Sequence, residues 1–165
     1  MDTVMQSTPG RTGSARGVPV YQALAEDIKK LGVPVFGLMS DDTALFVSTL
    51  DAIGVPYHAA RHESNALAMA DGYARYTGKV GVATVTCGPG FTQIMTALAT
   101  AARGSIPLVV FAGDSPTSAA WYVQQLELGP LATATGARYL PVKSVDRMLD
   151  TVREAFYTAK QERCP

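Results

Sequence analysis

The carboxylate of Glu63 is the group in this chain whose position most favours chemistry. It closes the tripeptide Arg61-His62-Glu63, at the junction between a short extended run, residues 57–60, and an alanine-rich helical segment. Loops with glycine and polar side chains follow other apolar runs, at residues 37–42, 86–90 and 113–116. In an open parallel α/β sheet, ligands bind outside the carboxyl ends of the strands. The sequence therefore predicts a ligand site in which one glutamate faces several glycine-rich loops.

An ordinary structural role is the alternative for the main residues of this site. A carboxylate in the first turn of a helix is favoured by the helix dipole, so Glu63 is also explained as a helix-start acid. The loop Gly88-Pro89-Gly90 precedes a helix whose free N–H groups could hold an anion. It is equally explained as a tight turn, since neither GxGxxG nor GxxxxGKS is present. Asp41 and Asp42 could bind a metal, but an acidic pair before Thr43 is more typical of a helix cap.

Two other groups of side chains leave alternatives open. His58 and His62 bracket a strand end, and a zinc site built from them with Cys87 lacks a recognisable spacing, so no metal site is predicted. Alanine recurs every four residues on one helix face, at Ala66, Ala70 and Ala74. Another backbone can approach such a face closely. Core packing explains this face, and so does a helix–helix subunit interface.

The composition of the 165-residue chain fits one globular domain with a sizeable core, since 47% of the residues are hydrophobic. The formal net charge is zero and no run of like charges occurs, which argues against nucleic acid and acidic membranes as partners. The longest apolar stretches, such as residues 106–112, are too short to span a bilayer. Two cysteines cannot form a disulfide framework, which suits a reducing, cytoplasmic location. Residues 1–17 lack the apolar region of a secretory signal and are interpreted as a flexible tail, with organelle targeting as the alternative.

Helical and strand patterns alternate from Val18 onward. Strands are expected near residues 35–38, 57–60, 80–86, 107–112 and 138–140. Helices are expected over residues 20–31, 43–53, 63–76, 91–99, 128–134 and 145–160. Strands that alternate with helices of this length form βαβ units around a parallel sheet. We therefore expect one α/β domain over residues 18–165, with three αβα layers and a mostly parallel sheet of five to six strands.

Several short motifs occur in one order along the chain. They are Phe36-Gly37, Arg61-His62-Glu63, residues 70–78, Thr86-Cys87-Gly88-Pro89-Gly90, residues 106–109 and residues 113–116. In this order they closely resemble the pyrimidine-binding domain of thiamine diphosphate enzymes. The branch that they resemble most is that of acetolactate synthase and benzoylformate decarboxylase. The resemblance runs from about Val18 to Ala159, which is nearly the whole chain.

The resemblance implies a catalytic role for Glu63. It matches the family glutamate that hydrogen-bonds N1′ of the cofactor's aminopyrimidine, and its proton shifts that ring towards the imino tautomer that deprotonates the thiazolium C2. The resemblance also implies further residues around the cofactor, namely Gly88, Pro89, Gly90 and Gln93. Substrate contacts are expected at Ser40, Asp41, Gln124 and Gln125. Thiamine diphosphate is therefore the expected cofactor, whereas the use of FAD stays open.

The same resemblance implies that this chain holds half of a cofactor site. The family binds magnesium and the diphosphate in a separate domain, through Gly-Asp-Gly and a later asparagine, and Gly113-Asp114-Ser115 is not that motif. The chain stops at residues 163–165, where the family continues into a final strand. We therefore expect a domain that is truncated before its last strand and inactive alone. Its expected partners are a diphosphate-binding domain of the same or another chain and further copies of itself, as a homodimer or tetramer.

The expected function is the pyrimidine-binding half of a 2-oxo acid decarboxylase or an acetolactate synthase-like carboligase. Ser40-Asp41 replaces a common Pro-Gly, and Val123-Gln124-Gln125 replaces Phe-Gln-Glu, which argues against strict acetolactate synthase activity. The alternative is a non-catalytic association domain. A generic nucleotide-binding Rossmann domain would need the glycine fingerprint that is absent here. The alanine face and an unpaired sheet edge are expected to make the isolated chain dimerise, bind a partner or aggregate.

Overall fold

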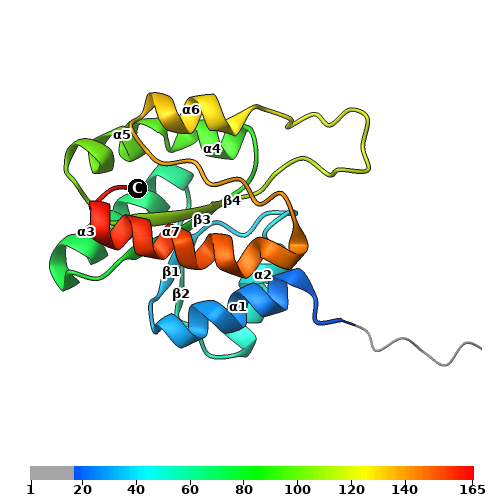
Figure 1. The fold of residues 1–165 in the computed structure, drawn as a ribbon, viewed down its shortest axis with the longest axis horizontal. Helices are drawn as coiled ribbons and strands as arrows, with labels where there is room; N and C mark the ends of the chain where they lie inside the picture. The colour runs from blue at the N-terminus through cyan, green and yellow to red at the C-terminus, as the bar shows by residue number, and fades with distance from the viewer. Residues whose placement is uncertain (1–16) are drawn as a thin grey trace, which may run out of the picture.

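The computed structural model describes residues 17–165, so the expected tail at residues 1–17 lies almost entirely outside the described part. Helices and strands alternate up to β4, as the sequence predicts, and only helical elements follow it (Figure 1). In chain order they are α1 (Val20–Leu31), β1 (Val35–Gly37), α2 (Ala44–Ala52), β2 (Tyr57–Ala59), α3 (Glu63–Thr77), β3 (Gly81–Val85), α4 (Pro89–Gln93), α5 (Met95–Arg103), β4 (Leu108–Ala112), α6 (Leu128–Ala134), the 3-10 turn η1 (Val145–Arg147) and α7 (Met148–Glu162). Across residues 17–165, no helix combines the length and the apolar character that a membrane span requires.

The four strands form one parallel sheet in the order β2-β1-β3-β4. Val35 of β1 lies opposite Val82 of β3, which in turn lies opposite Val109 of β4. Every residue of β3 is buried, as expected for a central strand that helices cover on both faces. Because the strands are parallel, the loops that follow them emerge at one edge of the sheet.

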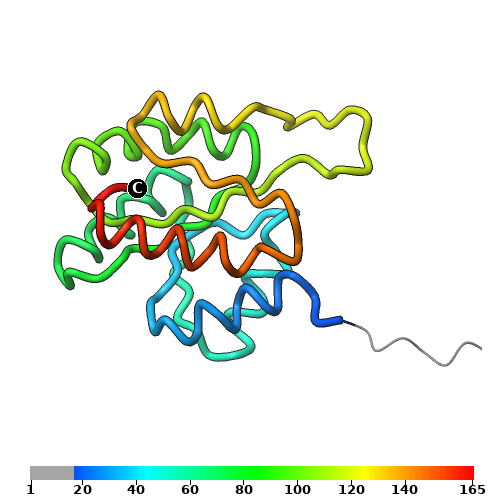
Figure 2. Tube along the Cα trace, viewed as in Figure 1, coloured from blue at the N-terminus to red at the C-terminus, as the bar shows by residue number. Residues whose placement is uncertain are grey.

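Helices cover both faces of the sheet, so the predicted three-layer α/β architecture is confirmed. One core cluster joins the sheet to α1, α2 and α7, and the other joins it to helices α3 to α6. Neighbouring strand residues alternate between the two clusters, as with Val82 and Ala83, because successive side chains point to opposite faces. The first and last helices, far apart in sequence, lie on the same side of the sheet (Figure 2).

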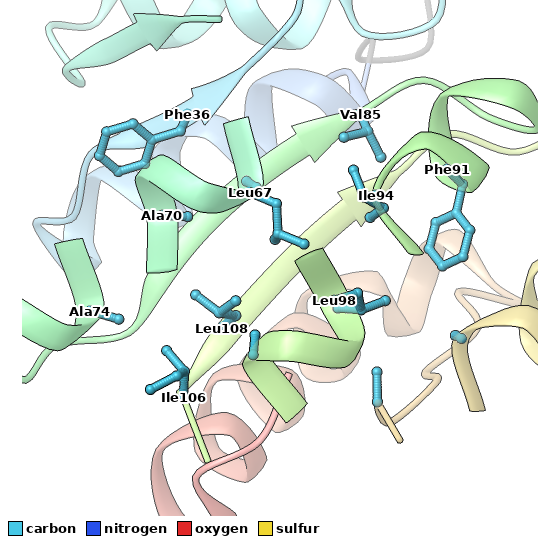
Figure 3. Packing of buried hydrophobic residues seen from close by; sticks show 14 of the residues in the cluster. Phe36, Leu67, Ala70, Ala74, Val85, Phe91, Ile94, Leu98, Ile106 and Leu108 are labelled. Carbon is cyan, nitrogen blue, oxygen red and sulfur yellow. The ribbon is translucent and has the colours of Figure 1, made fainter. Parts of the chain in front are cut away.

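The alanine face of α3 packs inside the core. Ala66 and Ala70 are fully buried and Ala74 is 3% exposed. Figure 3 shows Ala70 and Leu67 facing the apolar side chains of the core, among them Leu108. The backbone of α3 approaches β3 so closely that a Cβ atom on Gly81 would lie 2.2 Å from the carbonyl oxygen of Ala70. Core packing therefore explains this face, and the expectation that it leaves apolar surface for association is wrong.

The strand expected at residues 138–140 does not form, and the sheet has four strands rather than five or six. The N–H of Arg138 donates instead to the carbonyl of Pro165, at 2.9 Å. Pro141, directly after the expected strand, has no N–H to offer a ladder. An apolar pattern supplies the side chains of a strand but not the backbone pairing that a sheet needs, and residues 138–140 do not pair with the edge strand β4.

Candidate functional site

Glu63 is the first residue of α3 and lies at the carboxyl edge of the sheet. The chain enters α3 through His62, whose Nδ1 accepts a hydrogen bond from the backbone N–H of Ser64 at 3.2 Å. Glu63 is half-buried, and its Oε1 lies 3.4 Å from the position that a Cβ atom on Gly90 would occupy. The carboxylate therefore lies against the Gly88-Pro89-Gly90 loop, the arrangement in which it can act together with that loop.

The loop Gly88-Pro89-Gly90 forms the turn from β3 into α4. Gly88 has φ 52° and ψ −111°, a conformation that a residue with a side chain rarely adopts. Gly90 packs so closely that a Cβ atom there would lie 2.2 Å from Cγ2 of Thr86. The hydroxyl of Ser64, next to Glu63, donates to the carbonyl of Gln93 at the end of α4. This hydrogen bond joins the start of α3 to the end of α4.

Asp42 links the loop after β1 to the loop after β3. Its Oδ1 accepts a hydrogen bond from the hydroxyl of Ser40 at 2.6 Å. Its Oδ2 accepts one from the backbone N–H of Cys87 at 3.0 Å, across 45 residues of sequence. The helix-cap interpretation of Asp42 is therefore wrong: Thr43 occupies the N-cap position of α2, and no side chain caps that helix.

Gln124 connects the polar segment 113–127 to the same loops. Its Oε1 accepts hydrogen bonds from the Tyr122 hydroxyl at 3.0 Å and from the Cys87 thiol at 3.4 Å. Its backbone carbonyl oxygen lies only 1.9 Å from where a Cβ atom on Gly88 would lie. Gln125 is exposed, and its N–H donates to the carbonyl of Tyr122 at 2.9 Å. Of the two glutamines that the sequence singles out, Gln124 is the one that reaches the loops of the site.

The polar groups around Cys87 have different charge states at neutral pH. Burial raises the pKa of the Asp42 carboxyl, but hydrogen bonds from Ser40, Thr86 and the Cys87 N–H outweigh it, so this pKa lies below its usual value. Burial, and after it the charge of Asp42, raises the pKa of the Cys87 thiol. Burial and the neighbouring Cys87 likewise raise the pKa of the Tyr122 phenol. The site therefore holds an ionised carboxylate beside a protonated thiol and a protonated phenol.

The other residues singled out from the sequence make few contacts with the loops of the site. Ser40 bonds to Asp42, and Asp41 is exposed beside them, whereas Gln93 is exposed at the end of α4. His58 stacks on Phe36 with ring centroids 5.1 Å apart. No group of three or more His, Cys, Asp or Glu side chains that could hold a metal ion occurs within residues 17–165, so the zinc alternative has no support there.

A cavity of about 230 Å³ lies elsewhere, along β4 and beneath α7. Residues 137–142 also line it, and its walls are mostly apolar. Neither Glu63 nor the Gly88-Pro89-Gly90 loop lines it. The chemistry predicted for Glu63 therefore belongs to the loops at the carboxyl edge of the sheet rather than to this cavity.

The contacts of Asp42, Cys87 and Tyr122 are the part of the site that sequence reasoning missed. Asp42 was singled out as a cap or metal ligand, and Cys87 only as a zinc ligand or as part of a motif. The sequence contains one indication of these contacts, the glycines at positions 88 and 113. A glycine allows another group to pack closely against the backbone, but the sequence does not identify that group as Gln124 or Asp42.

Comparison with known protein families gives one match that spans most of the chain. The family described as "Thiamine pyrophosphate enzyme, N-terminal TPP binding domain" matches residues 19–130. The matched region contains all the loops of the candidate site described above.

Curated proteins with similar sequences include synthases and a decarboxylase. The chain is 38% identical over 112 residues to acetolactate synthase isozyme 3 large subunit of Escherichia coli, which covers 67% of this chain and 20% of that protein. It is 40% identical over 105 residues to the mitochondrial acetolactate synthase catalytic subunit of Saccharomyces cerevisiae, covering 62% of this chain and 15% of that protein. It is 42% identical over 90 residues to the probable 2-ketoarginine decarboxylase AruI of Pseudomonas aeruginosa, covering 54% of this chain and 16% of that protein. The chain spans a fifth or less of the length of these relatives.

Proposed function

The chain belongs to the thiamine pyrophosphate enzymes, whose N-terminal TPP binding domain it matches, and we propose that it supplies the pyrimidine-binding half of a thiamine diphosphate-dependent 2-oxo acid decarboxylase or carboligase. The observation that carries this proposal is the contact between Glu63 and Gly90. A carboxylate at a helix start, beside a loop that two glycines keep free of side chains, suits a flat heterocycle with a ring nitrogen.

The residues present fit the pyrimidine end of thiamine diphosphate. Among residues 17–165, neither a hydrogen bond nor an ion pair engages the carboxylate of Glu63, so both oxygens are available to a ligand. A Cβ atom at Gly90 would lie 2.2 Å from Cγ2 of Thr86 and 3.4 Å from Oε1 of Glu63. The absence of a side chain at Gly90 therefore lets the loop pack closely on Thr86 beside the Glu63 carboxylate.

In the proposed mechanism, Glu63 holds a proton and shares it with N1′ of the aminopyrimidine. Gly88, Pro89, Gly90 and Gln93 would also bind the pyrimidine ring. When bound, thiamine diphosphate supplies the electron sink that accepts the electron pair left when a 2-oxo acid loses carbon dioxide. Ser40, Asp41, Gln124 and Gln125 are proposed to orient the substrate.

The proposal also covers the partners of the chain and its cellular location. We propose that magnesium and the diphosphate are held by a diphosphate-binding domain of the same or another chain. We also propose a homodimer or tetramer in the cytoplasm. Exposed apolar side chains on the loop after β1, the first turn of α2 and the 113–127 segment support docking of another domain here. They are Met39, Leu45, Trp121 and Val123.

The same exposed apolar side chains also favour a second candidate function, a domain that associates with a partner without taking part in chemistry. In that case the Glu63 carboxylate would have no part in turnover, and it would be an ordinary helix-start acid. The two functions make opposite predictions for a single substitution.

Glu63→Gln is the substitution that tests the proposal. Glutamine keeps the shape and a hydrogen-bonding group but cannot deliver the proton to N1′. In an enzyme reconstituted from this chain and a diphosphate-binding polypeptide with magnesium, the turnover of pyruvate or another 2-oxo acid should fall about 100-fold or more. The affinity for thiamine diphosphate should change far less, because the lost interaction belongs to activation rather than to anchoring.

Glu154→Gln is the matched control, since Glu154 is exposed on α7 and lies outside the site. It should leave both turnover and cofactor affinity at the parent values. A Glu63→Gln enzyme that runs at the parent rate would return the chain to the association function.

A further inference from the structure

The carboxylate of Asp42 holds together the loops that follow three different strands. It accepts the hydroxyl of Ser40 in the loop after β1 and the backbone N–H of Cys87 in the loop after β3. It also lies on Gly113, the first residue after β4, where a Cβ atom would be 1.8 Å from Oδ2. The carboxylate thus occupies the space that a side chain at position 113 would need.

The surroundings of Asp42 keep this carboxylate ionised and fixed. Among residues 17–165 no lysine, arginine or histidine forms an ion pair with it. Asp42 is exposed at the surface, and hydrogen bonds from Ser40, Thr86 and the Cys87 N–H outweigh its partial desolvation, so its pKa lies below the usual value. Hydrogen bonds to an ionised acceptor are stronger than those between neutral groups, so this carboxylate is a firm attachment point for the Cys87 N–H.

The backbone of Cys87 connects Asp42 to the Gly88-Pro89-Gly90 loop through hydrogen bonds. Its carbonyl accepts the N–H of Gly90 at 3.2 Å, and its thiol donates to Gln124. The residue is almost fully buried, with 2% of its surface exposed. Its backbone is therefore held by Asp42 on one side and by Gly90 on the other, and Gly90 lies against Glu63.

We propose that Asp42 is a positioning residue that fixes the Gly88-Pro89-Gly90 loop relative to Glu63 through the backbone N–H of Cys87. It touches no reacting atom in this proposal. Its effect on turnover rests on the proposed function, whereas its effect on the loop does not.

The first test needs no cofactor and uses hydrogen exchange of the backbone amides, followed by NMR on the chain alone. In Asp42→Ala the Cys87 amide loses its acceptor, so it should exchange about tenfold faster than in the parent. In Asp42→Asn the side-chain oxygen still accepts this bond, so exchange should be much closer to the parent rate. Asp51→Ala, an exposed aspartate on α2, is the control and should leave the Cys87 amide unchanged.

The second test is turnover in the reconstituted enzyme. Asp42→Ala should lower kcat by about 10- to 100-fold, as expected when a catalytic loop is displaced by a fraction of an ångström to 1 Å. Asp42→Asn should restore most of this loss, and Asp51→Ala should not lower kcat. A merely structural role would reduce the amount of folded enzyme but would not change kcat per folded molecule.

The outcomes separate this inference from the proposed function. The proposed function is overturned if the reconstituted enzyme is inactive or if its activity does not depend on Glu63. In that case the exchange rate of the Cys87 amide alone tests the role of Asp42. A Cys87 amide that exchanges at the parent rate in Asp42→Ala overturns the inference. So does a kcat equal to that of Asp51→Ala in a Glu63-dependent enzyme. If Asp42→Ala does not fold, Asp42→Asn decides: full loss of amide protection in that folded variant contradicts the retained hydrogen bond.

Discussion

Replacing Gly88 by alanine should lower the free energy of unfolding strongly. The effect should be much larger than at the positive-φ glycines that have open space around them, such as Gly78. The Cβ atom added at position 88 would lie 1.9 Å from the carbonyl oxygen of Gln124, and real Cβ contacts are essentially never shorter than 3.0 Å. The position of a Cβ atom is fixed by its backbone, and its partner is a backbone carbonyl, so no rotamer change can relieve this contact. The 113–127 segment would therefore have to retreat from the loop.

The magnitude follows from three separate costs. The conformation at φ 52° and ψ −111° costs an alanine about 1–3 kcal/mol. The retreat of Gln124 breaks its 3.4 Å hydrogen bond with the Cys87 thiol, at about 0.5–1.5 kcal/mol. Residual crowding of the overpacked loop costs about 1–3 kcal/mol. The expected total loss in the free energy of unfolding is about 5 kcal/mol, the sum of the midpoints of these ranges.

Gly78→Ala is the matched control for this prediction. Gly78 ends α3 with φ 70°, and a Cβ atom there would meet no other atom within 4 Å. It therefore bears only the strain of the left-handed conformation, about 1 kcal/mol. The difference between the two variants isolates the contact between Gly88 and Gln124.

Urea unfolding followed by far-UV circular dichroism measures both variants, with the midpoint reporting stability when the m-value is unchanged. Trp121 is the one tryptophan of the sequence and lies on the 113–127 segment, 75% exposed. Its fluorescence anisotropy should fall in Gly88→Ala, because the segment loses its attachment, and should stay at the parent value in Gly78→Ala. The reasoning is refuted if Gly88→Ala costs no more than Gly78→Ala.

Two further predictions concern the core and the thiols. Ala70→Val should destabilise by about 1–3 kcal/mol in urea unfolding, because Ala70 is fully buried against β3. Ala68→Val, exposed on the same helix, should cost only about 0.5 kcal/mol of helix propensity, and equal losses would contradict the core assignment. In native protein at pH 8, iodoacetamide should modify Cys87 much more slowly than Cys164, since burial raises the pKa of both thiols but only Cys87 is almost inaccessible. Peptide mapping by mass spectrometry measures both rates, and a Cys87 that reacts as fast as Cys164 would show that the 113–127 segment does not cover it.

Local pattern and turn chemistry were enough to predict most of the elements. The strand expected at residues 80–86 is β3 at Gly81–Val85, and the helix expected at 63–76 is α3 at Glu63–Thr77. Gly78 ends α3 in the left-handed conformation that its position at the end of a periodic segment predicts. These features depend on residues within one or two turns of each other, so a single sequence contains the information that they need.

Several predictions were wrong where the structure depends on more than local apolar spacing. The helical repeat from Phe91 onward is interrupted at Ile94, where α4 gives way to α5, although the apolar spacing continues without a break. The segment at residues 138–140 has the side chains of a strand but does not pair with the edge strand β4. Asp42 looked like a local cap, whereas its partner is the backbone of Cys87, 45 residues away. Polar contacts of that range follow from the assembled sheet and cannot be deduced from local spacing.

The two carboxylates at the carboxyl edge of the sheet differ in what they bond to, and this difference suggests how their roles divide. Asp42 is exposed, yet both of its oxygens accept hydrogen bonds from the protein and its pKa is held low, so it is an ionised group that links two loops. Glu63 has no hydrogen-bond or ion-pair partner among residues 17–165 and lies beside Gly90. A carboxylate that must exchange a proton with a bound ring needs a free oxygen, whereas one that must hold a loop needs occupied ones. The hydrogen bonds of Asp42 therefore favour the positioning role that we propose for it, and the unengaged carboxylate of Glu63 favours the proton transfer that we propose for it. Reversing the two proposed roles would leave the Cys87 N–H without its acceptor.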